Sequence, residues 1–173
     1  RAYEIILLPQ NATMAPVSLK MPNKKAIESL TIKAQTGVTD LRYTGAITFT
    51  SDVVVENVNF VQVTKAGEAY KETDTPAAVS VSTGGNELTL NGKVTFNTPI
   101  KLDGKRTGIL NINGTLTTIT YYDQYGICGS ITNFAEVNIR NTNENPETKL
   151  NQIILGDYGN TAPSFSATVL NMD

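Results

Sequence analysis

The stretch Leu88-Thr-Leu-Asn-Gly-Lys-Val-Thr-Phe96 decides the expected fold, because Leu110-Asn-Ile-Asn-Gly-Thr-Leu-Thr-Thr118 repeats its pattern 22 positions later. Each stretch contains two short strand-like triplets whose first residues are 6 positions apart. The segments Ile131–Ile139 and Ile47–Val55 contain the same offset of 6. A short, fixed period of strands is the sequence signature of a repeat architecture.

This repeat predicts an all-β fold, a single-stranded parallel β-helix or solenoid, with rungs of about 22 residues. One such rung cannot bury its own apolar side chains, so it must stack on its neighbours. Apolar residues alternate along each triplet, which places one set inside and the other in solvent. The 22-residue offset predicts that Leu88 stacks on Leu110 and that Val94 stacks on Leu116.

The dipeptides Asn91-Gly92 and Asn113-Gly114 follow the first triplet of each unit and are also 22 positions apart. Asn and Gly tolerate the left-handed backbone region that a sharp corner needs, so we expect corners there with the two Asn amides adjacent. Asn-Gly is equally the strongest two-residue hairpin signal, which leaves a row of antiparallel hairpins as the alternative. The shared offset favours the stacked arrangement.

The chain shows no domain boundary, so we expect one β-solenoid domain over residues 1–173. The polar stretches Lys65–Pro76 and Asn141–Lys149 are interpreted as loops that project from corners. Ile153 lies 22 positions after Ile131, which predicts that the period resumes there. Because the chain begins with Arg1 rather than Met, we expect it to be a fragment or a processed segment of a longer protein.

Composition restricts the chemistry of this chain. A net charge of −2 argues against a nucleic-acid partner, which normally leaves a basic footprint. No apolar run has the length of a membrane span. The chain has no His and one Cys, Cys128, so Ser-His-Asp, Cys-His and ordinary zinc sites are excluded. We expect no catalytic residue, no metal and no cofactor.

Carboxylates are the remaining candidates for catalysis. A glycosidase needs two of them about 5 to 9 Å apart in a cleft. Chance among 16 acidic residues can also place two together, so a working pair is not expected. The scattered candidates are Asp40, Asp52, Glu56, Asp103, Asp123 and Asp157.

The aromatic cluster Tyr121-Tyr-Asp-Gln-Tyr125 is the one local feature with binding character. Tyr offers a flat apolar face and a polar tip, which suits sugars and protein surfaces. Strand alternation would place Tyr121 and Tyr125 on one face, and we single them out as ligand-binding candidates. The alternative is that these rings pack against the fold.

The Leu-Thr-Leu-Asn-Gly and Leu-Asn-Ile-Asn-Gly units resemble rungs of right-handed parallel β-helix proteins, the pectin-lyase-like superfold, over residues 30–155. Their Thr- and Asn-rich composition is similar to that of secreted or cell-surface bacterial proteins that use solenoids as stalks and adhesive modules. The resemblance implies a non-enzymatic, extracellular or cell-surface adhesion module. Its partner would be a glycan or a host or cell-surface protein, with flanking domains in the same parent chain.

The same resemblance leaves a carbohydrate-active enzyme, a polysaccharide lyase or hydrolase or a fragment of one, as the alternative function. Enzymes of this superfold use clustered Asp together with Lys or Arg on one face. No such motif can be matched residue by residue in this sequence, and fold alone does not determine function.

Overall fold

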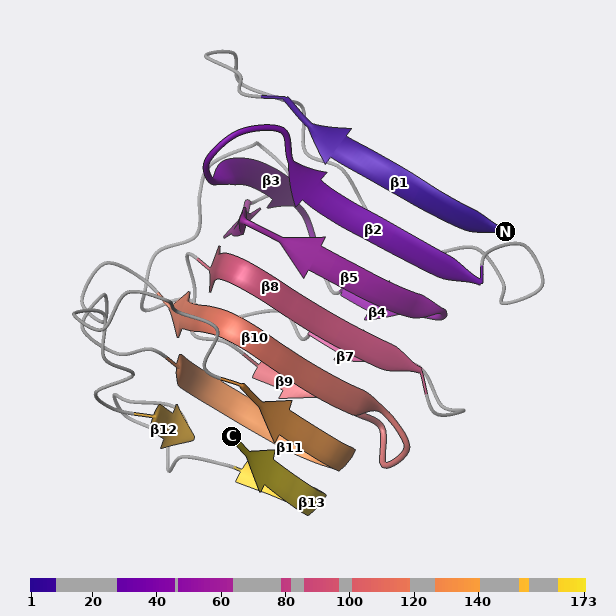
Figure 1. Cartoon of the computed structure of the whole chain (residues 1–173), viewed down its shortest axis with the longest axis vertical. Helices are drawn as coiled ribbons and strands as arrows, with labels where there is room; N and C mark the ends of the chain where they lie inside the picture. Colours follow the sequence, from indigo (N-terminus) through magenta and orange to yellow (C-terminus); the bar gives the residue numbers. More distant parts are fainter. Residues whose placement is uncertain are drawn as a thin grey trace.

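The protein, seen in a computed structural model, is all-β, with mostly parallel strands joined in one large sheet (Figure 1). The structure describes residues 1–8, 28–45, 47–63, 79–81, 86–96, 101–118, 127–140, 153–155 and 165–173. The strands in these ranges are β1 (Ala2–Leu7), β2 (Ser29–Ala34), β3 (Thr39–Tyr43), β4 (Ile47–Phe49), β5 (Asp52–Glu56), β6 (Val58–Gln62), β7 (Val79–Val81), β8 (Glu87–Phe96), β9 (Lys101–Asp103), β10 (Ile109–Thr118), β11 (Ile127–Ile139), β12 (Ile153–Leu155) and β13 (Phe165–Met172).

Strand pairing sorts these strands into three columns. The front column runs β1-β2-β5-β8-β10 and continues through the ends of β11 and β13. The side column contains β3, β6 and the second halves of β8 and β10. The rear column contains β4, β7, β9 and the middle of β11, and Figure 1 shows β4, β7 and β9 behind β5, β8 and β10.

The pairing of β8 with β10 confirms the 22-residue stacking. Leu88 pairs with Leu110 and Val94 with Leu116, in a parallel register that is continuous along both strands. The alternative of antiparallel hairpins at the Asn-Gly dipeptides is therefore wrong, because each dipeptide lies inside a strand that pairs in parallel.

The β10–β11 pair is irregular. Ile109 to Ile112 pair in ascending order with Glu136 to Ile139, as parallel neighbours do, whereas Leu116 pairs with Ile127. The long strand β11 thus changes neighbours along its length: its first residues also meet β12, its middle meets β9 and its end meets β10.

The 22-residue period does not extend to the other units. Ile131 pairs with Leu102 in the rear column, and Val137 is the residue that pairs with Leu110. Ile153 pairs with Ile127 rather than with Ile131, so the predicted return of the period is also wrong.

The unit that begins at Ile47 departs in the same way. Val53, not Ile47, shares the front column with Leu88, and Ile47 pairs with Val79 in the rear column. The physical reason is that consecutive triplets occupy consecutive columns, so an offset of six does not say which column comes first.

The core lies between the columns. Inward side chains such as Leu88, Leu110 and Ile112 of the front column join Ile47 and Leu102 of the rear column in one buried cluster. Two aromatic rings of the side column, Tyr43 and Phe60, meet edge to face, with centroids 6.1 Å apart. Such pairs add to the stabilisation from buried area, so the rings fix the side column against the core.

Left-handed backbone at the bends belongs to the glycines and not to the preceding asparagines. Gly92 has φ of +64° and Gly114 of +155°, whereas Asn91 and Asn113 are not among the residues with positive φ. The two Asn side chains are adjacent as predicted, with Asn113 Nδ2 donating to Asn91 Oδ1 at 3.0 Å. Their role is therefore hydrogen bonding between strands rather than left-handed geometry.

Gly92 also lacks room for a side chain. A Cβ there would overlap the amide oxygen of Asn57, which accepts a hydrogen bond from the Lys93 backbone N–H at 3.0 Å. Gly37 provides a matched control, because its φ of +58° is similar but nothing lies within 4 Å of the Cβ position.

We expect Gly92→Ala to reduce the free energy of unfolding by about 2–3 kcal/mol and Gly37→Ala by only about 1 kcal/mol. Both variants suffer left-handed strain, but only the first must also displace Asn57. Urea denaturation followed by circular dichroism measures the difference. Equal losses in the two variants would contradict the close packing of Gly92 on Asn57.

Candidate functional site

The outward face of the front column carries a row of hydrogen-bonded polar side chains, which we call the amide ladder: Thr89, Asn111, Asn138 and Asn171. Asn111 Nδ2 donates to Thr89 Oγ1 at 3.2 Å, Asn138 Nδ2 donates to Asn111 Oδ1 at 2.9 Å, and Asn171 Nδ2 donates to Asn138 Oδ1 at 2.7 Å. The strand register places these side chains in line, and the apolar neighbours on both sides of Thr89, Asn111 and Asn138 are buried in the core.

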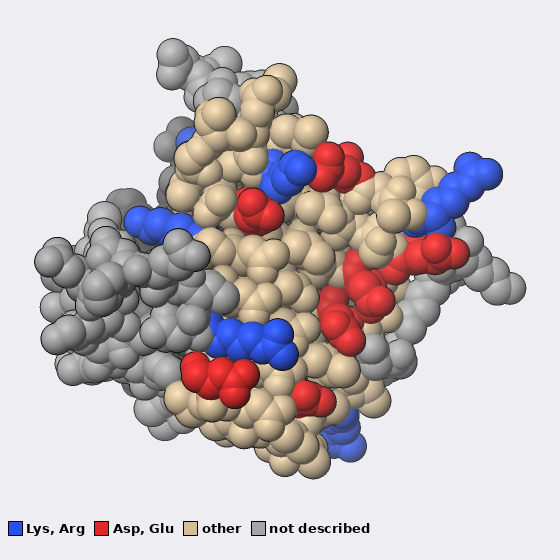
Figure 2. Space-filling model, viewed as in Figure 1, with Lys and Arg blue, Asp and Glu red and all other residues tan. Residues whose placement is uncertain are grey.

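Acidic side chains border the ladder where the strands of the front column begin. Figure 2 shows acidic residues gathered along the right-hand margin of this face. Asp52 and Glu87 start β5 and β8, and Asp52 Oδ1 accepts a hydrogen bond from the Glu87 backbone N–H at 3.0 Å. Glu136 Oε1 accepts from Asn171 Nδ2 at 3.1 Å, which ties this margin to the ladder.

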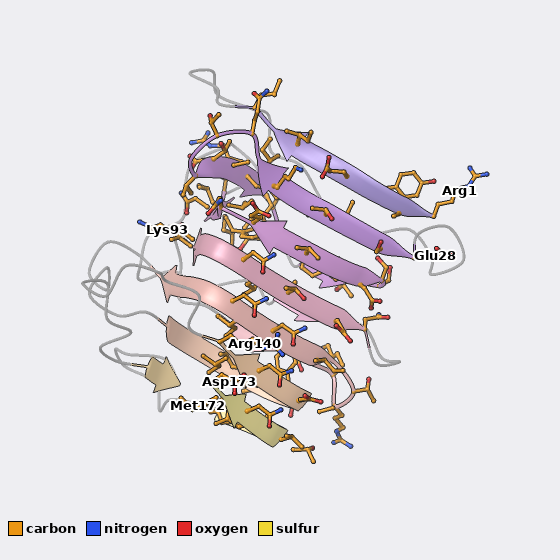
Figure 3. The ribbon with its side chains drawn as sticks, in the orientation of Figure 1. Arg1, Glu28, Lys93, Arg140, Met172 and Asp173 are labelled. Carbon is orange, nitrogen blue, oxygen red and sulfur yellow. The ribbon has the colours of Figure 1, made fainter. Side chains whose placement is uncertain are left out.

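A shallow, open hollow of about 330 Å³ lies where the ladder reaches the last strands. Arg140 Nε lies 3.8 Å from Asp173 Oδ2, and both side chains are exposed, so water screens this ion pair and it contributes little to stability. Figure 3 shows Arg140, Asp173 and Met172 close together on this side. The hollow is lined by Glu136, Asn138, Ile139, Arg140, Asn171 and Asp173.

The hollow offers both hydrogen-bond donors and acceptors. Arg140 contributes guanidinium N–H groups, while Glu136 and Asp173 contribute carboxylate oxygens. The ladder holds the amides in fixed positions, so a polar ligand would meet groups that are already ordered. The arrangement suits recognition of a polar surface more than enclosure of a small apolar molecule.

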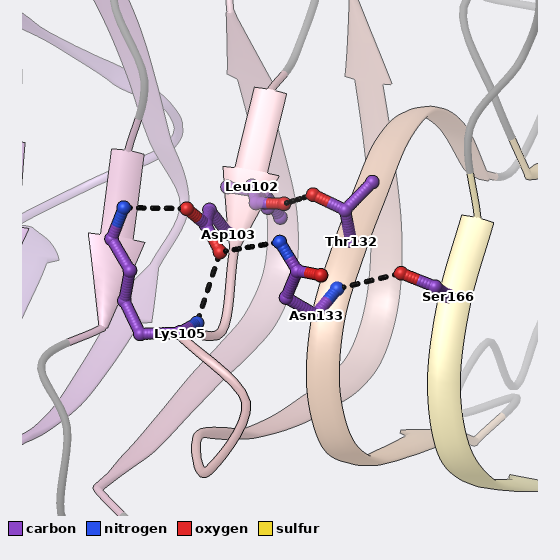
Figure 4. Close-up of polar contacts among 6 residues, drawn as sticks. All are labelled: Leu102, Asp103, Lys105, Thr132, Asn133 and Ser166. Atoms are coloured by element: carbon purple, nitrogen blue, oxygen red, sulfur yellow. Dashed lines mark hydrogen bonds and ion pairs between the residues drawn. The ribbon is translucent and has the colours of Figure 1, made fainter.

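A second polar cluster lies at the end of β9 (Figure 4). Asp103 accepts hydrogen bonds from the Lys105 ammonium at 2.6 Å, from the Lys105 backbone N–H at 2.9 Å and from Asn133 Nδ2 at 3.2 Å. Lys105, Arg106 and Asn133 all have positive φ, so this corner combines three left-handed residues that are not glycine. The three bonds to Asp103 hold that conformation in place.

Partial burial acts to raise the pKa of Asp103, but the hydrogen bonds from Lys105 and Asn133 and the charge of Lys105 outweigh it, so this pKa lies below its ordinary value. The Asp103 cluster is therefore best explained as a structural corner that depends on an ionised carboxylate. Its groups are already paired with one another, which leaves them little capacity for catalysis.

Because the folded pKa of Asp103 is depressed, its contribution to stability is present above the unfolded value of about 3.9 and is lost as pH falls through the folded pKa. We expect Asp103→Asn to lower stability at neutral pH and to flatten the decrease in acid. Urea midpoints measured from neutral pH down to about pH 3 test this. Lys105→Gln should have the same effect to a smaller degree, and parallel curves for all three proteins would contradict it.

The amide ladder gives a second stability test at Asn138, which both donates and accepts within the ladder. Asn138→Thr replaces the amide by a hydroxyl, the group that Thr89 uses in the same row, whereas Asn138→Val introduces a side chain of nearly the same shape as Thr but without a hydrogen-bonding group. We expect the Thr variant to be more stable than the Val variant by about 1 kcal/mol. Equal thermal unfolding of the two would show that the ladder bonds add nothing measurable.

Tyr121 and Tyr125 lie outside the described residues, as do the loop Lys65–Pro76, Asp123 and Asp157. Their proposed roles stay predictions. Cys128 lies in β11, where its backbone pairs with Ile154.

The described carboxylates of the predicted set do not converge. Asp40 accepts a hydrogen bond from Asn59 in the side column, Asp52 and Glu56 lie at opposite ends of β5, and Asp103 ends the rear strand β9. Among the residues that the structure describes, no group of three or more acidic, Cys or His residues is placed to hold a metal.

The sequence prediction did not include the amide ladder. Its signal was present as an apolar-Asn-apolar triplet that occurs at 110–112, 137–139 and 170–172. The spacing between these triplets is unequal, so a search for a fixed period of 22 did not align them. Only the register of the strands brings the three Asn residues together.

Comparison of the chain with protein-family models, with curated proteins and with solved structures finds no match. The described part of the chain also contains no helix with the length and apolar character of a membrane span.

Proposed function

We propose that this chain is a non-enzymatic binding module built on a parallel β-solenoid, of the adhesive kind found on cell surfaces or in secreted proteins. The solenoid proposal is supported by the order in which the chain visits the columns. β2, β3 and β4 lie in the front, side and rear columns, and β5 then returns to the front column beside β2. A chain that repeats this circuit winds in one direction and makes only local contacts between turns.

The observation that carries the binding proposal is the amide ladder with the hollow at its end. The ladder is a linear, ordered row of amides on an exposed face, bordered by carboxylates and by Arg140. An extended glycan or an extended surface of a protein presents hydroxyl, amide and charged groups at short intervals, which such a row can match. The proposed ligand is therefore an extended polar one, a glycan or a host or cell-surface protein.

One observation favours the alternative, a carbohydrate-active enzyme. Glu136 and Asp173 share the hollow with Arg140, which places two carboxylates and a cation on one face. Against this, Asp173 is paired with Arg140, Glu136 accepts from Asn171, and the hollow is open to solvent. A glycosidase or lyase site requires a cleft that orders the substrate between catalytic groups that are free to exchange protons, so binding without turnover is the preferred function.

Glycan-array and cell-binding assays test the proposal with the wild-type chain and three variants. We expect binding by the wild type and a loss of about tenfold in Arg140→Ala, because a charged hydrogen bond contributes roughly this factor. Lys93→Ala removes an exposed cation at the bend of β8 and serves as the matched control. Tyr121→Ala/Tyr125→Ala tests the sequence-predicted tyrosines.

Three results would decide against this function or this site. Absence of binding to any glycan or cell would remove the adhesive function. Equal losses in Arg140→Ala and Lys93→Ala would place the ligand elsewhere. Turnover of a polysaccharide that disappears in Glu136→Gln and Asp173→Asn would favour the enzyme.

A further inference from the structure

Among the residues that the structure describes, no strand pairs with the second edge of β13, which we call its open edge. Within the described part of the chain it pairs only with β11, and Figure 1 shows it as the lowest strand of the front column. Three apolar side chains are unusually exposed there, Val169 at 44%, Leu170 at 39% and Met172 at 56%. An edge of this kind can pair with another strand, and native proteins normally protect it.

The backbone of β13 is arranged to accept such a strand. The Asp173 N–H donates to Ile139 O at 3.0 Å, toward β11. Because N–H groups alternate in direction along a parallel strand, those of Leu170 and Met172 point toward the open edge. The open edge therefore offers backbone donors that pairing with β11 does not use.

The amide ladder has a direction, and this direction specifies the side chain that would come next. Each Asn donates its Nδ2 to the preceding strand: Asn138 to Asn111, and Asn171 to Asn138. The Asn171 Nδ2 group also donates to Glu136, so its donor capacity is used. Its Oδ1 is the acceptor at the end of the row, and a strand added in register would meet it with a side-chain N–H.

We propose that the open edge of β13 is a strand-addition site for a parallel segment of another polypeptide with the pattern apolar-Asn-apolar-Arg or apolar-Asn-apolar-Lys. The apolar residues cover Leu170 and Met172, and the Asn donates to Asn171 Oδ1. The cation lies opposite Asp173, as Arg140 does from the other side at 3.8 Å. Strand addition of this kind takes affinity from backbone bonds and specificity from alternate side chains.

A second copy of this chain is a poor occupant, although in the described part of the chain its β1 pairs only with β2 and leaves Tyr3 and Ile5 exposed. Glu4 lies between these two residues and pairs with Thr31 in the ladder row. Its carboxylate, bound to Lys33 at 2.7 Å, has only acceptor oxygens when ionised. If β1 of a second copy were added in register, the Glu4 carboxylate would face Asn171 Oδ1, and two acceptors would meet without a donor between them. This disfavours head-to-tail stacking of copies.

The site does not depend on the glycan- or cell-binding function proposed above, and peptides test it directly. The probe is a fluorescent peptide that copies Asn133–Arg140 (Asn-Phe-Ala-Glu-Val-Asn-Ile-Arg) and thus contains the required pattern. The control peptide has Asp at the position of Asn138, and a second control copies Arg1–Leu7 of β1. We expect the first peptide to bind at least about tenfold more tightly than either control, since each control replaces the amide donor by a carboxylate.

Two variants of the protein separate backbone pairing from side-chain contact. Met172→Pro removes an outward N–H but no bond to β11, whereas Met172→Ala keeps that N–H and removes the same side chain. We expect Met172→Pro to reduce peptide binding by about a further tenfold relative to Met172→Ala. Circular dichroism confirms that both variants fold.

A tethered peptide keeps the test decisive if free peptides bind weakly. Joining the same segment to Asp173 through a flexible Gly/Ser linker raises its effective concentration to the millimolar range. Hydrogen exchange of the Leu170 and Met172 amides should then slow at least about tenfold, but not with the Asp-containing segment. Unchanged exchange with the tethered peptide, equal binding of all three peptides, or head-to-tail oligomers of the unmodified chain would each overturn the proposal.

Discussion

The parallel register of the front column is the constraint on which the rest of the structure depends. Along β8, β10 and the end of β11, inward apolar residues alternate with outward polar ones, and a slip of one residue would exchange the two faces. The buried residues Leu88, Leu110 and Val137 fix the register from inside. Everything that we propose on the outer face follows from that fixed alignment.

The amide ladder is the clearest consequence. An Asn on an exposed strand would ordinarily hydrogen-bond to water and gain little from its neighbours. Here the register places Asn111, Asn138 and Asn171 in line, and each donates to the residue before it in the row, while Asn111 and Asn138 also accept from the residue after. The row is therefore both a stabilising element and a preordered polar surface, and its polarity gives its two ends different chemistry.

The bends show how the same constraint acts on the backbone. The strands β8 and β10 turn from the front column into the side column without losing their pairing, and Gly92 and Gly114 supply the necessary backbone freedom. Asn57 occupies the corresponding bend between β5 and β6 with φ of +55°, and its side chain fills the space above Gly92. Close packing between successive bends thus restricts which residues each bend can hold.

The sequence by itself determined the strand alternation, the all-β class and the stacking of Leu88 on Leu110. The first two depend on local patterning, and the stacking depends on the 22-residue offset between two similar segments of the chain. It did not determine which column each triplet joins. Leu88 and Val94 are six positions apart and lie in the front and side columns. Ile131 and Val137 are also six positions apart but lie in the rear and front columns, so the spacing alone does not tell the two cases apart. Only packing of the whole sheet distinguishes them, and with that choice the tertiary structure also decided the ladder, the hollow and the open edge of β13.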